Sequence, residues 1–256
     1  MGLRYLFILG CLCLFTACLE KGGEKESVIA YGVMRYDSIH KQPVMDIGKQ
    51  SKILLSNPAF DELTIGGSYI VNYWKSKPES SYDPQKIYDV NIYSPPIPVP
   101  SGIVDSKMMV QDTMGFFQNE GLISSISYDE KRDYIGGHGF ITVNFPSYYG
   151  QAQEIHLCYN PLAEPDTMKG KNYYDLFFRL RIQDLGDIYN PGFTNKLMHS
   201  YELESFMQAV FQKEREAGRD TFYVRLKYAK DVLKTDSTKM VWGDKSIMYI
   251  AQKKQK

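Results

Sequence analysis

The thiol of Cys18 lies in the sequence context that most clearly predicts a chemical modification. Arg4 precedes an apolar run from Leu6 to Leu14, and Phe15-Thr16-Ala17 leads directly to Cys18. A short positive segment, a hydrophobic core and small residues before the cleavage point are typical of a secretory signal, and a cysteine at the cut supplies a thiol for lipid attachment. The sequence therefore predicts a signal peptide over residues 1–17 and a lipoprotein that carries palmitate on Cys18.

The apolar core of this segment is too short to remain as a membrane anchor, because a spanning helix needs roughly 20 apolar residues. Cys11 is the rival acceptor, but cleavage there would leave too little apolar chain for a signal core. Residues 18–27 are small and charged, which favours a flexible, lipidated tether. We therefore expect a lipid-anchored protein of the cell envelope, at the outer membrane, on its periplasmic face or at the cell surface.

Histidine and cysteine side chains elsewhere do not have the spacing of a metal site. His138 lies in Gly136-Gly137-His138-Gly139, which favours a tight turn, and His40 and His199 are isolated. His156 and Cys158 project to the same face of an expected strand, but neither His-x-x-His nor His-Glu-x-x-His occurs. We expect Cys158 to be a small buried residue and predict no metal site and no cofactor.

Acidic residues and hydroxyls give no clear catalytic arrangement either. Asp184, Asp187 and Asn190 could coordinate calcium, but their segment lacks the ligand alternation of an EF-hand and favours a solvated loop. The chain has no Gly-x-Ser-x-Gly motif, and the pairs Asp61-Glu62 and Asp129-Glu130 favour turns. We therefore expect a protein that is not an enzyme, with a hydrolase assembled from distant residues as the least favoured alternative.

The charge balance argues against nucleic acid as a partner. Removal of Arg4 with the signal leaves 29 basic residues against 30 acidic ones. Over residues 28–94 there are seven of each sign. Nucleic-acid affinity comes largely from the neutralisation of phosphates, and a net charge of zero provides no such attraction.

Aromatic residues leave glycan or peptidoglycan binding open. The chain has 20 Tyr, 13 Phe and 2 Trp. Tyr148 and Tyr149 in one turn, or Trp74 with Tyr82, could present rings to a sugar, although aromatic residues also fill β-sheet cores. We therefore keep glycan binding as the alternative to a role as an envelope adaptor or structural module.

The elements that would position these residues are mainly β-strands. The first five expected strands alternate apolar and polar residues and suit a small OB-like barrel over residues 28–94. Four prolines in residues 95–102 predict an extended linker and a domain boundary. The five expected strands of the barrel span residues 28–36, 43–47, 52–55, 68–74 and 86–93.

Residues 103–256 predict an antiparallel β-sandwich with one covering helix. Apolar residues recur at helical spacing from Leu203 to Phe211, and their polar neighbours are of mixed sign, which favours packing on a sheet over membrane binding. The expected strands span residues 121–127, 140–145, 154–159, 175–182, 221–228 and 246–250.

This order of parts resembles the NigD-like lipoproteins of Bacteroidetes. The resemblance is carried by the signal segment, by residues 63–73 in the barrel, and by residues 140–145, 156–157, 175–182 and 228–249 in the sandwich. It implies an exported lipoprotein with an OB-like domain and a β-sandwich. It brings no established catalytic residues, so the expected partners are the membrane and an unidentified envelope protein or glycan.

Overall fold

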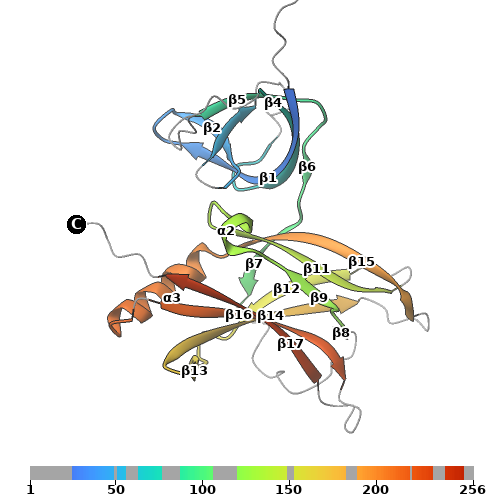
Figure 1. Ribbon diagram of the computed structural model, residues 1–256, viewed down its shortest axis with the longest axis vertical. Helices are drawn as coiled ribbons and strands as arrows, with labels where there is room; N and C mark the ends of the chain where they lie inside the picture. The colour runs from blue at the N-terminus through green and yellow to red at the C-terminus, as the bar shows by residue number, and fades with distance from the viewer. Residues whose placement is uncertain are drawn as a thin grey trace, which may run out of the picture.

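The chain forms two β-sheets, which Figure 1 shows as an upper, nearly barrel-shaped body and a lower, layered body. The computed structural model describes residues 25–48, 51–55, 63–76, 87–105, 120–148, 153–182, 189–219, 221–232 and 240–250. The six-stranded sheet contains β1 to β6, and the eleven-stranded sheet contains β7 to β17. The predicted mainly β fold is confirmed.

The six-stranded sheet has the strand order β1-β2-β3-β5-β4, and β4 pairs again with β1 to close the barrel. Strands β3 and β5 are parallel, while the other pairs are antiparallel. This five-stranded closure agrees with the predicted OB-like barrel. The strands are β1 (Lys25–Asp37), β2 (Gln42–Asp46), β3 (Lys52–Leu55), β4 (Ser68–Ser76), β5 (Ile87–Ile92) and the short β6 (Ile97–Pro98).

Closure depends on a change of partner within β1. The first part of β1 pairs with β4, and from Val33 onward it pairs with β2. Gly32 lies at this change, and a Cβ there would lie 2.3 Å from the carbonyl oxygen of Asp46. The two strands meet so closely that only glycine fits. The barrel core consists of Met34, Met45, Ile53, Val71, Tyr73 and Val90.

The eleven-stranded sheet folds into a sandwich because β7 pairs with a strand of each layer. Its partners are β15 in one layer and β12 in the other, and both pairings are parallel. Strands β14 and β16 are also parallel, because the chain between them passes through β15 and α3. The sandwich is thus mixed rather than purely antiparallel.

The layer next to the barrel contains β9 (Ser125–Ser127), β10 (Tyr134–Ile135), β11 (His138–Tyr148) and β15 (Tyr189–Glu202), with the short helix α2 (Glu130–Asp133) before β10. The other layer contains β8 (Glu120–Gly121), β12 (Gln153–Tyr159), β13 (Asp166–Met168), β14 (Lys171–Ile182), β16 (Thr221–Val232) and β17 (Met240–Ile250). Strand β7 spans Ser101–Asp105.

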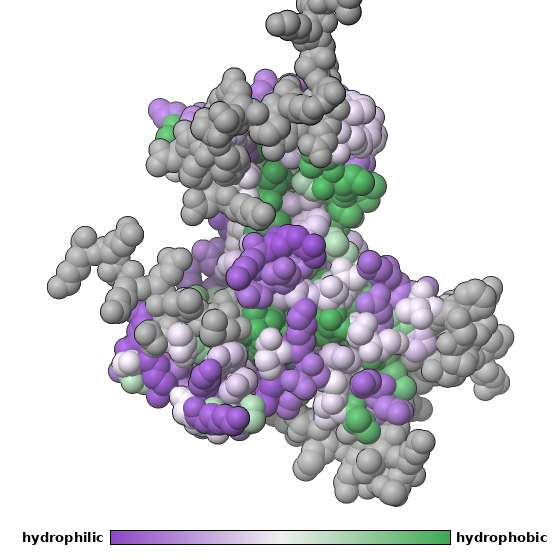
Figure 2. All heavy atoms as spheres, viewed as in Figure 1, coloured by the Kyte–Doolittle hydropathy of each residue, from purple (hydrophilic) through white to green (hydrophobic). Residues whose placement is uncertain are grey.

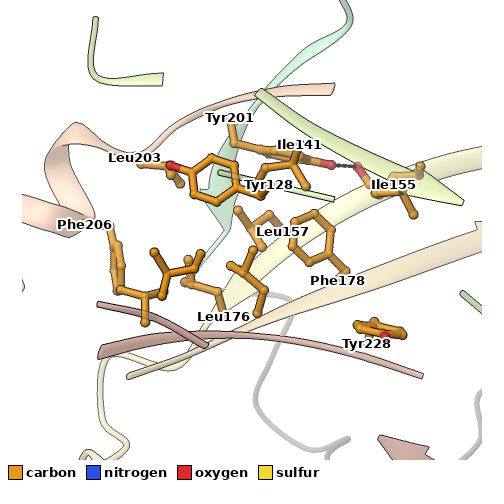
Figure 3. Close-up of a cluster of buried hydrophobic side chains, with 14 of the residues drawn as sticks. Tyr128, Ile141, Ile155, Leu157, Leu176, Phe178, Tyr201, Leu203, Phe206 and Tyr228 are labelled. Atoms are coloured by element: carbon orange, nitrogen blue, oxygen red, sulfur yellow. Dashed lines mark hydrogen bonds between the residues drawn. The ribbon is translucent and has the colours of Figure 1, made fainter. Parts of the chain in front are cut away.

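The sandwich core lies between these layers and is covered at one end by α3 (Glu204–Glu216) (Figures 1 and 3). Tyr201 and Phe178 face each other across it with ring centroids 5.7 Å apart, and the Tyr201 hydroxyl donates to the carbonyl of Ile155. Phe206 and Met207 of α3 complete this core. The predicted covering helix is therefore confirmed.

The proline-rich segment at residues 95–102 carries a strand on each sheet. Ile97 pairs with Ile70 in the barrel, and the N–H of Val99 donates to the carbonyl of Ser68 over 2.8 Å. Ser101 then pairs with Ser200 in the sandwich. The segment thus passes from one sheet to the other with its backbone bonded to both.

Candidate functional site

The described side chains that are best suited to chemistry gather where the barrel meets the sandwich, which we call the junction. Its apolar centre packs the ring of Tyr31 against Phe140, with centroids 4.9 Å apart. Both aromatic side chains come from strand faces that would otherwise be exposed to solvent. The rest of this apolar cluster consists of Val33, Ile70, Val99, Ile135 and Met198.

Hydrogen bonds surround this apolar centre. The Tyr31 hydroxyl donates to the carboxylate of Asp133, the last residue of helix α2. The Arg35 guanidinium donates to the carbonyl of Gly136 and lies 3.4 Å from the carboxylate of Glu204 at the start of α3. Barrel side chains therefore reach three separate segments of the sandwich.

A buried polar chain crosses the same junction. The Oγ atoms of Ser68 and Ser200 lie 2.6 Å apart, and Ser200 Oγ lies 3.0 Å from Nδ1 of His138. Both serines are buried. A serine next to a histidine is the arrangement of an activated nucleophile. Here the Ser200 hydroxyl is fully covered, so this arrangement serves to join the two sheets.

The junction shifts the pKa values of its titratable groups. Burial, followed by the hydrogen bond to Asp133, raises the pKa of Tyr31 to about 12. Burial lowers the pKa of His138, and it outweighs the opposing effect of Glu202 and Glu204. Tyr31 is therefore a neutral donor and His138 a neutral ring near pH 7, so both hydrogen bonds persist without a change of charge.

The turn that carries His138 has the predicted form. Gly136 and Gly137 have φ angles of 55° and 79°, which glycine adopts without strain. Asp129 caps the preceding helix, since its carboxylate accepts from the N–H of Lys131 over 3.1 Å. These polar residues therefore shape the junction.

The other predicted residues do not converge on His138. His156 lies on β12 beside Glu154, at 3.2 Å, and His199 lies on β15 with its ring stacked near Tyr201. Cys158 is fully buried, as predicted. No group of three or more His, Cys, Asp or Glu that could hold a metal occurs among the described residues.

Several predicted residues lie outside the described part of the chain. Cys18 is among them, as are the two carboxylates of the candidate calcium loop. Trp74 is described, but it pairs with Tyr93, at 5.1 Å between ring centroids. The residues outside the described part are Cys18, Asp61, Glu62, Tyr82, Tyr149, Asp184 and Asp187.

A second grouping, absent from the sequence-based candidates, lies on the outer face of β14 and β16, away from the sandwich core. Arg225 forms a two-point ion pair with Asp175, with nitrogen–oxygen distances of 2.6 and 2.9 Å, and a further ion pair with Asp166 at 3.0 Å. Lys227 lies 3.0 Å from Asp175. This outer face is thus a connected network of charges.

Aromatic rings lie within this network. Tyr173 and Tyr223 stack with centroids 4.8 Å apart, and Phe177 meets Trp242 at 5.4 Å and 80°. Arg225 lies over the Tyr173 ring, and Lys171 lies over the Tyr223 ring. The signal in the sequence that could have indicated this network is the series Tyr173, Asp175 and Phe177, which are alternate residues of β14 and so share one face. An outer face of a sheet is usually polar, whereas this face also carries aromatic residues.

No protein-family model and no curated protein matches this chain. Solved structures share its fold. An uncharacterized protein from Parabacteroides merdae is 18% identical, with 88% of this chain and 100% of that chain covered and a TM-score of 0.64. A candidate lipoprotein from Bacteroides fragilis is 7% identical, with 90% and 100% covered and a TM-score of 0.56.

A NigD-like immunity protein from Bacteroides caccae is also similar, at 10% identity, with 88% of this chain and 96% of that chain covered and a TM-score of 0.45. None of the three is named as an enzyme. In the described residues, no helix is long and apolar enough to cross a membrane.

Proposed function

We propose that this chain is a lipid-anchored, non-enzymatic protein of the cell envelope that acts as an adaptor for another envelope protein. One observation carries this proposal: at the junction, side chains of chemically reactive types form hydrogen bonds that join the two sheets. Tyr31, His138 and Ser200 are all bonded across or beside it. The barrel and sandwich then behave as one body that presents a surface to a partner.

The lipid at Cys18 places that body close to a membrane. Six residues, 19–24, lie between Cys18 and Lys25, the first residue of β1, so seven Cα–Cα steps join the two residues. Even fully extended, they span at most about 25 Å. The barrel lies between this tether and the sandwich, because β1 begins at the end of the barrel that is remote from the junction (Figure 1). The sandwich would thus face away from the membrane.

The outer face of β14 and β16 is the surface we assign to the protein partner. Its aromatic rings and paired charges resemble the composition of protein interfaces, where aromatic residues and arginine are enriched. The Asp175–Arg225 pair fixes these groups before any partner arrives, which reduces the entropy lost on binding.

Glycan binding is the second candidate function. The arrangement of aromatic rings on the outer face of β14 and β16 argues against sugar binding at that face. Sugar stacking needs an uncovered ring face. The rings of Tyr173 and Tyr223 are stacked on each other, and a cationic group lies over each. An array of envelope polysaccharides and peptidoglycan fragments tests this directly, and specific binding that is lost in Tyr223→Ala would favour the glycan proposal over the protein partner.

Anchoring is tested by incorporation of radiolabelled palmitate and by membrane fractionation of the full chain. Cys18→Ala should abolish both, because it removes the acceptor thiol. Cys11→Ala is the matched control and should leave both unchanged. Continued labelling and membrane fractionation of the Cys18→Ala variant would contradict the lipoprotein proposal.

The partner face is tested with a photoreactive phenylalanine derivative at Ser246. This exposed residue pairs with Arg225, so it lies at the edge of the proposed face. The control position is Lys196, exposed on β15 in the other layer. We expect one discrete protein adduct from Ser246 in intact cells and none from Lys196. Equal adduct patterns from the two positions would contradict the assignment of this face.

A further inference from the structure

A group of exposed apolar residues lies on the outer wall of the barrel, and we call it the barrel patch. It consists of Ile29 in β1, Trp74 in β4, Tyr93 after β5 and Ile97 in β6, which are 72%, 43%, 46% and 53% exposed. Figure 2 shows apolar residues on the side of the barrel along which β1 and β6 run. Contiguous apolar surface of this kind marks an interaction site.

Strand register places these side chains on one face. Ser27 lies opposite Trp74, and Ile29 opposite Asn72, so both pairs point away from the barrel core. Farther along the same face, Tyr31 lies opposite Ile70, and these two residues contribute to the junction. This face of the barrel wall therefore carries apolar side chains at both ends: the sandwich covers Tyr31 and Ile70, whereas Ile29 and Trp74 are exposed.

The aromatic pair of the barrel patch is held in a fixed arrangement. The rings of Trp74 and Tyr93 lie 5.1 Å apart at 42°, and the Tyr93 hydroxyl lies 2.7 Å from Oγ of Ser27. The tyrosine thus keeps its polar atom bonded while its ring remains exposed. Rings with one apolar part and one polar end are the side chains that concentrate at membrane–water interfaces.

The barrel patch also lies near the point where the tether leaves the barrel. Ser27, opposite Trp74, is two residues from Lys25, the start of β1. The tether between Cys18 and Lys25 spans at most about 25 Å. A lipid on Cys18 therefore holds this end of the barrel within reach of the bilayer surface. A soluble partner would have to enter the same narrow space.

From the position and chemistry of this patch we infer that Ile29, Trp74 and Tyr93 insert into the membrane–water interface of the leaflet that holds the Cys18 lipid. This inference rests on the proposed lipid anchor and adds a second, non-covalent contact. The equal numbers of basic and acidic residues in 28–94 mean that anionic lipids do not repel this domain as a whole. Two points of attachment orient the body, so that the sandwich faces away from the bilayer.

Fluorescence of Trp74 tests this contact in the full, lipidated chain. The protein has two tryptophans, so Trp242→Phe leaves Trp74 as the single reporter. The protein is reconstituted into vesicles of phosphatidylethanolamine and phosphatidylglycerol, with or without brominated phosphatidylcholine. We expect a blue shift and quenching of Trp74 by about half, as for a ring at the interface. The matched protein Trp74→Phe reports Trp242 on the sandwich, which should not be quenched.

A paired substitution tests the role of the neighbouring isoleucine. Ile29→Ser should reduce the quenching of Trp74 at least about two-fold, because it removes an apolar contact with lipid. Ile39→Ser is the control, since Ile39 is also exposed on the barrel but lies in the β1–β2 turn. Both side chains are exposed, so neither substitution should affect folding.

The outcomes separate this inference from the lipid anchor. Acylated protein that floats with vesicles but shows unquenched Trp74 would overturn the membrane contact and leave the anchor in place. Protein that is neither acylated nor floats would overturn the anchor itself. Equal quenching of Trp74 and Trp242 would also overturn the proposed orientation.

Discussion

The hydroxyl oxygen of Ser68 in the barrel lies 2.6 Å from that of Ser200 in the sandwich. Ser200 in turn lies 3.0 Å from the half-buried His138, so a series of three polar side chains joins the sheets. Such groups are stable inside a protein because each one satisfies its neighbour. Because these polar side chains lie at the contact between the barrel and the sandwich, the junction is held by specific hydrogen bonds as well as by apolar packing.

Ser200, the middle residue of this hydrogen-bonded series, should contribute more to stability than Ser68 at its end. Ser200→Ala leaves both Ser68 and His138 without that hydroxyl and should reduce the free energy of unfolding by about 1–3 kcal/mol. Ser68→Ala leaves the Ser200–His138 contact intact and should reduce it by about 0.5–1.5 kcal/mol. Urea denaturation measures both values. A larger effect for Ser68→Ala would contradict the proposed chain.

Stability should fall when the pH is lowered below about 6.5. Burial lowers the pKa values of His138 and His199 from 6.5, so the unfolded chain binds protons that the folded chain does not. The stabilisation is present above pH 6.5 and is lost as the pH falls through the folded-state values. Denaturation midpoints between pH 7.5 and pH 5.5, measured at steps of about 0.5, follow this loss.

His138→Gln should make that pH dependence shallower, because it removes one of the two histidines whose pKa is lowered by burial in the folded state. An unchanged profile in His138→Gln would show that the junction histidine does not carry the effect.

Position 32, where the pairing partner of β1 changes from β4 to β2, should tolerate only glycine. Gly32→Ala places a Cβ 2.3 Å from the carbonyl oxygen of Asp46, so the strands must separate, at a cost of about 1–3 kcal/mol or more. Gly102→Ala is the control, because its nearest neighbours lie at 3.4 Å. Thermal unfolding compares the two variants. Equal melting temperatures would contradict the tight crossing of β1 and β2.

Alternation in the sequence was enough to locate most strands. The expected strands at residues 28–36, 43–47 and 52–55 correspond to β1, β2 and β3, because one face of each lies in the barrel core and the other outside it. The helix was found for the same reason, since its buried residues recur at helical spacing.

Strand β15 and the junction were not predicted, and both depend on tertiary contacts. β15 contains Pro191-Gly192, which favours a loop in isolation. In the structure these two residues lie at a register shift, and β15 pairs with β11 on both sides of it. Tyr31 and Val33 alternate as the outward side of a strand, and only the presence of the sandwich buries them. Strands β14 and β16 are parallel because the chain between them crosses over through α3, and no local sequence pattern indicates this long connection.

Helix α3 should depend on one buried carboxylate. Glu214 accepts hydrogen bonds from Arg219, Tyr174 and Asn172 at 2.7 to 3.1 Å. Burial raises its pKa, but these bonds outweigh burial and hold the pKa below its usual value. Arg219→Ala should therefore reduce the free energy of unfolding by about 1.5–3 kcal/mol.

Arg215→Ala is the matched control for this helix, because Arg215 is exposed. It should change stability by less than about 0.5 kcal/mol. Urea denaturation of the two variants measures the difference, and similar values would show that the buried carboxylate does not need its arginine.

The central claim is that lipid at Cys18 holds this two-sheet body on a membrane. Mass spectrometry of the mature protein's N-terminal peptide, taken from the membrane fraction of intact cells, tests it most directly. We predict a peptide that begins at Cys18 and carries the mass of a diacylglyceryl group on its thiol. A peptide that begins elsewhere, or an unmodified Cys18, would contradict the account.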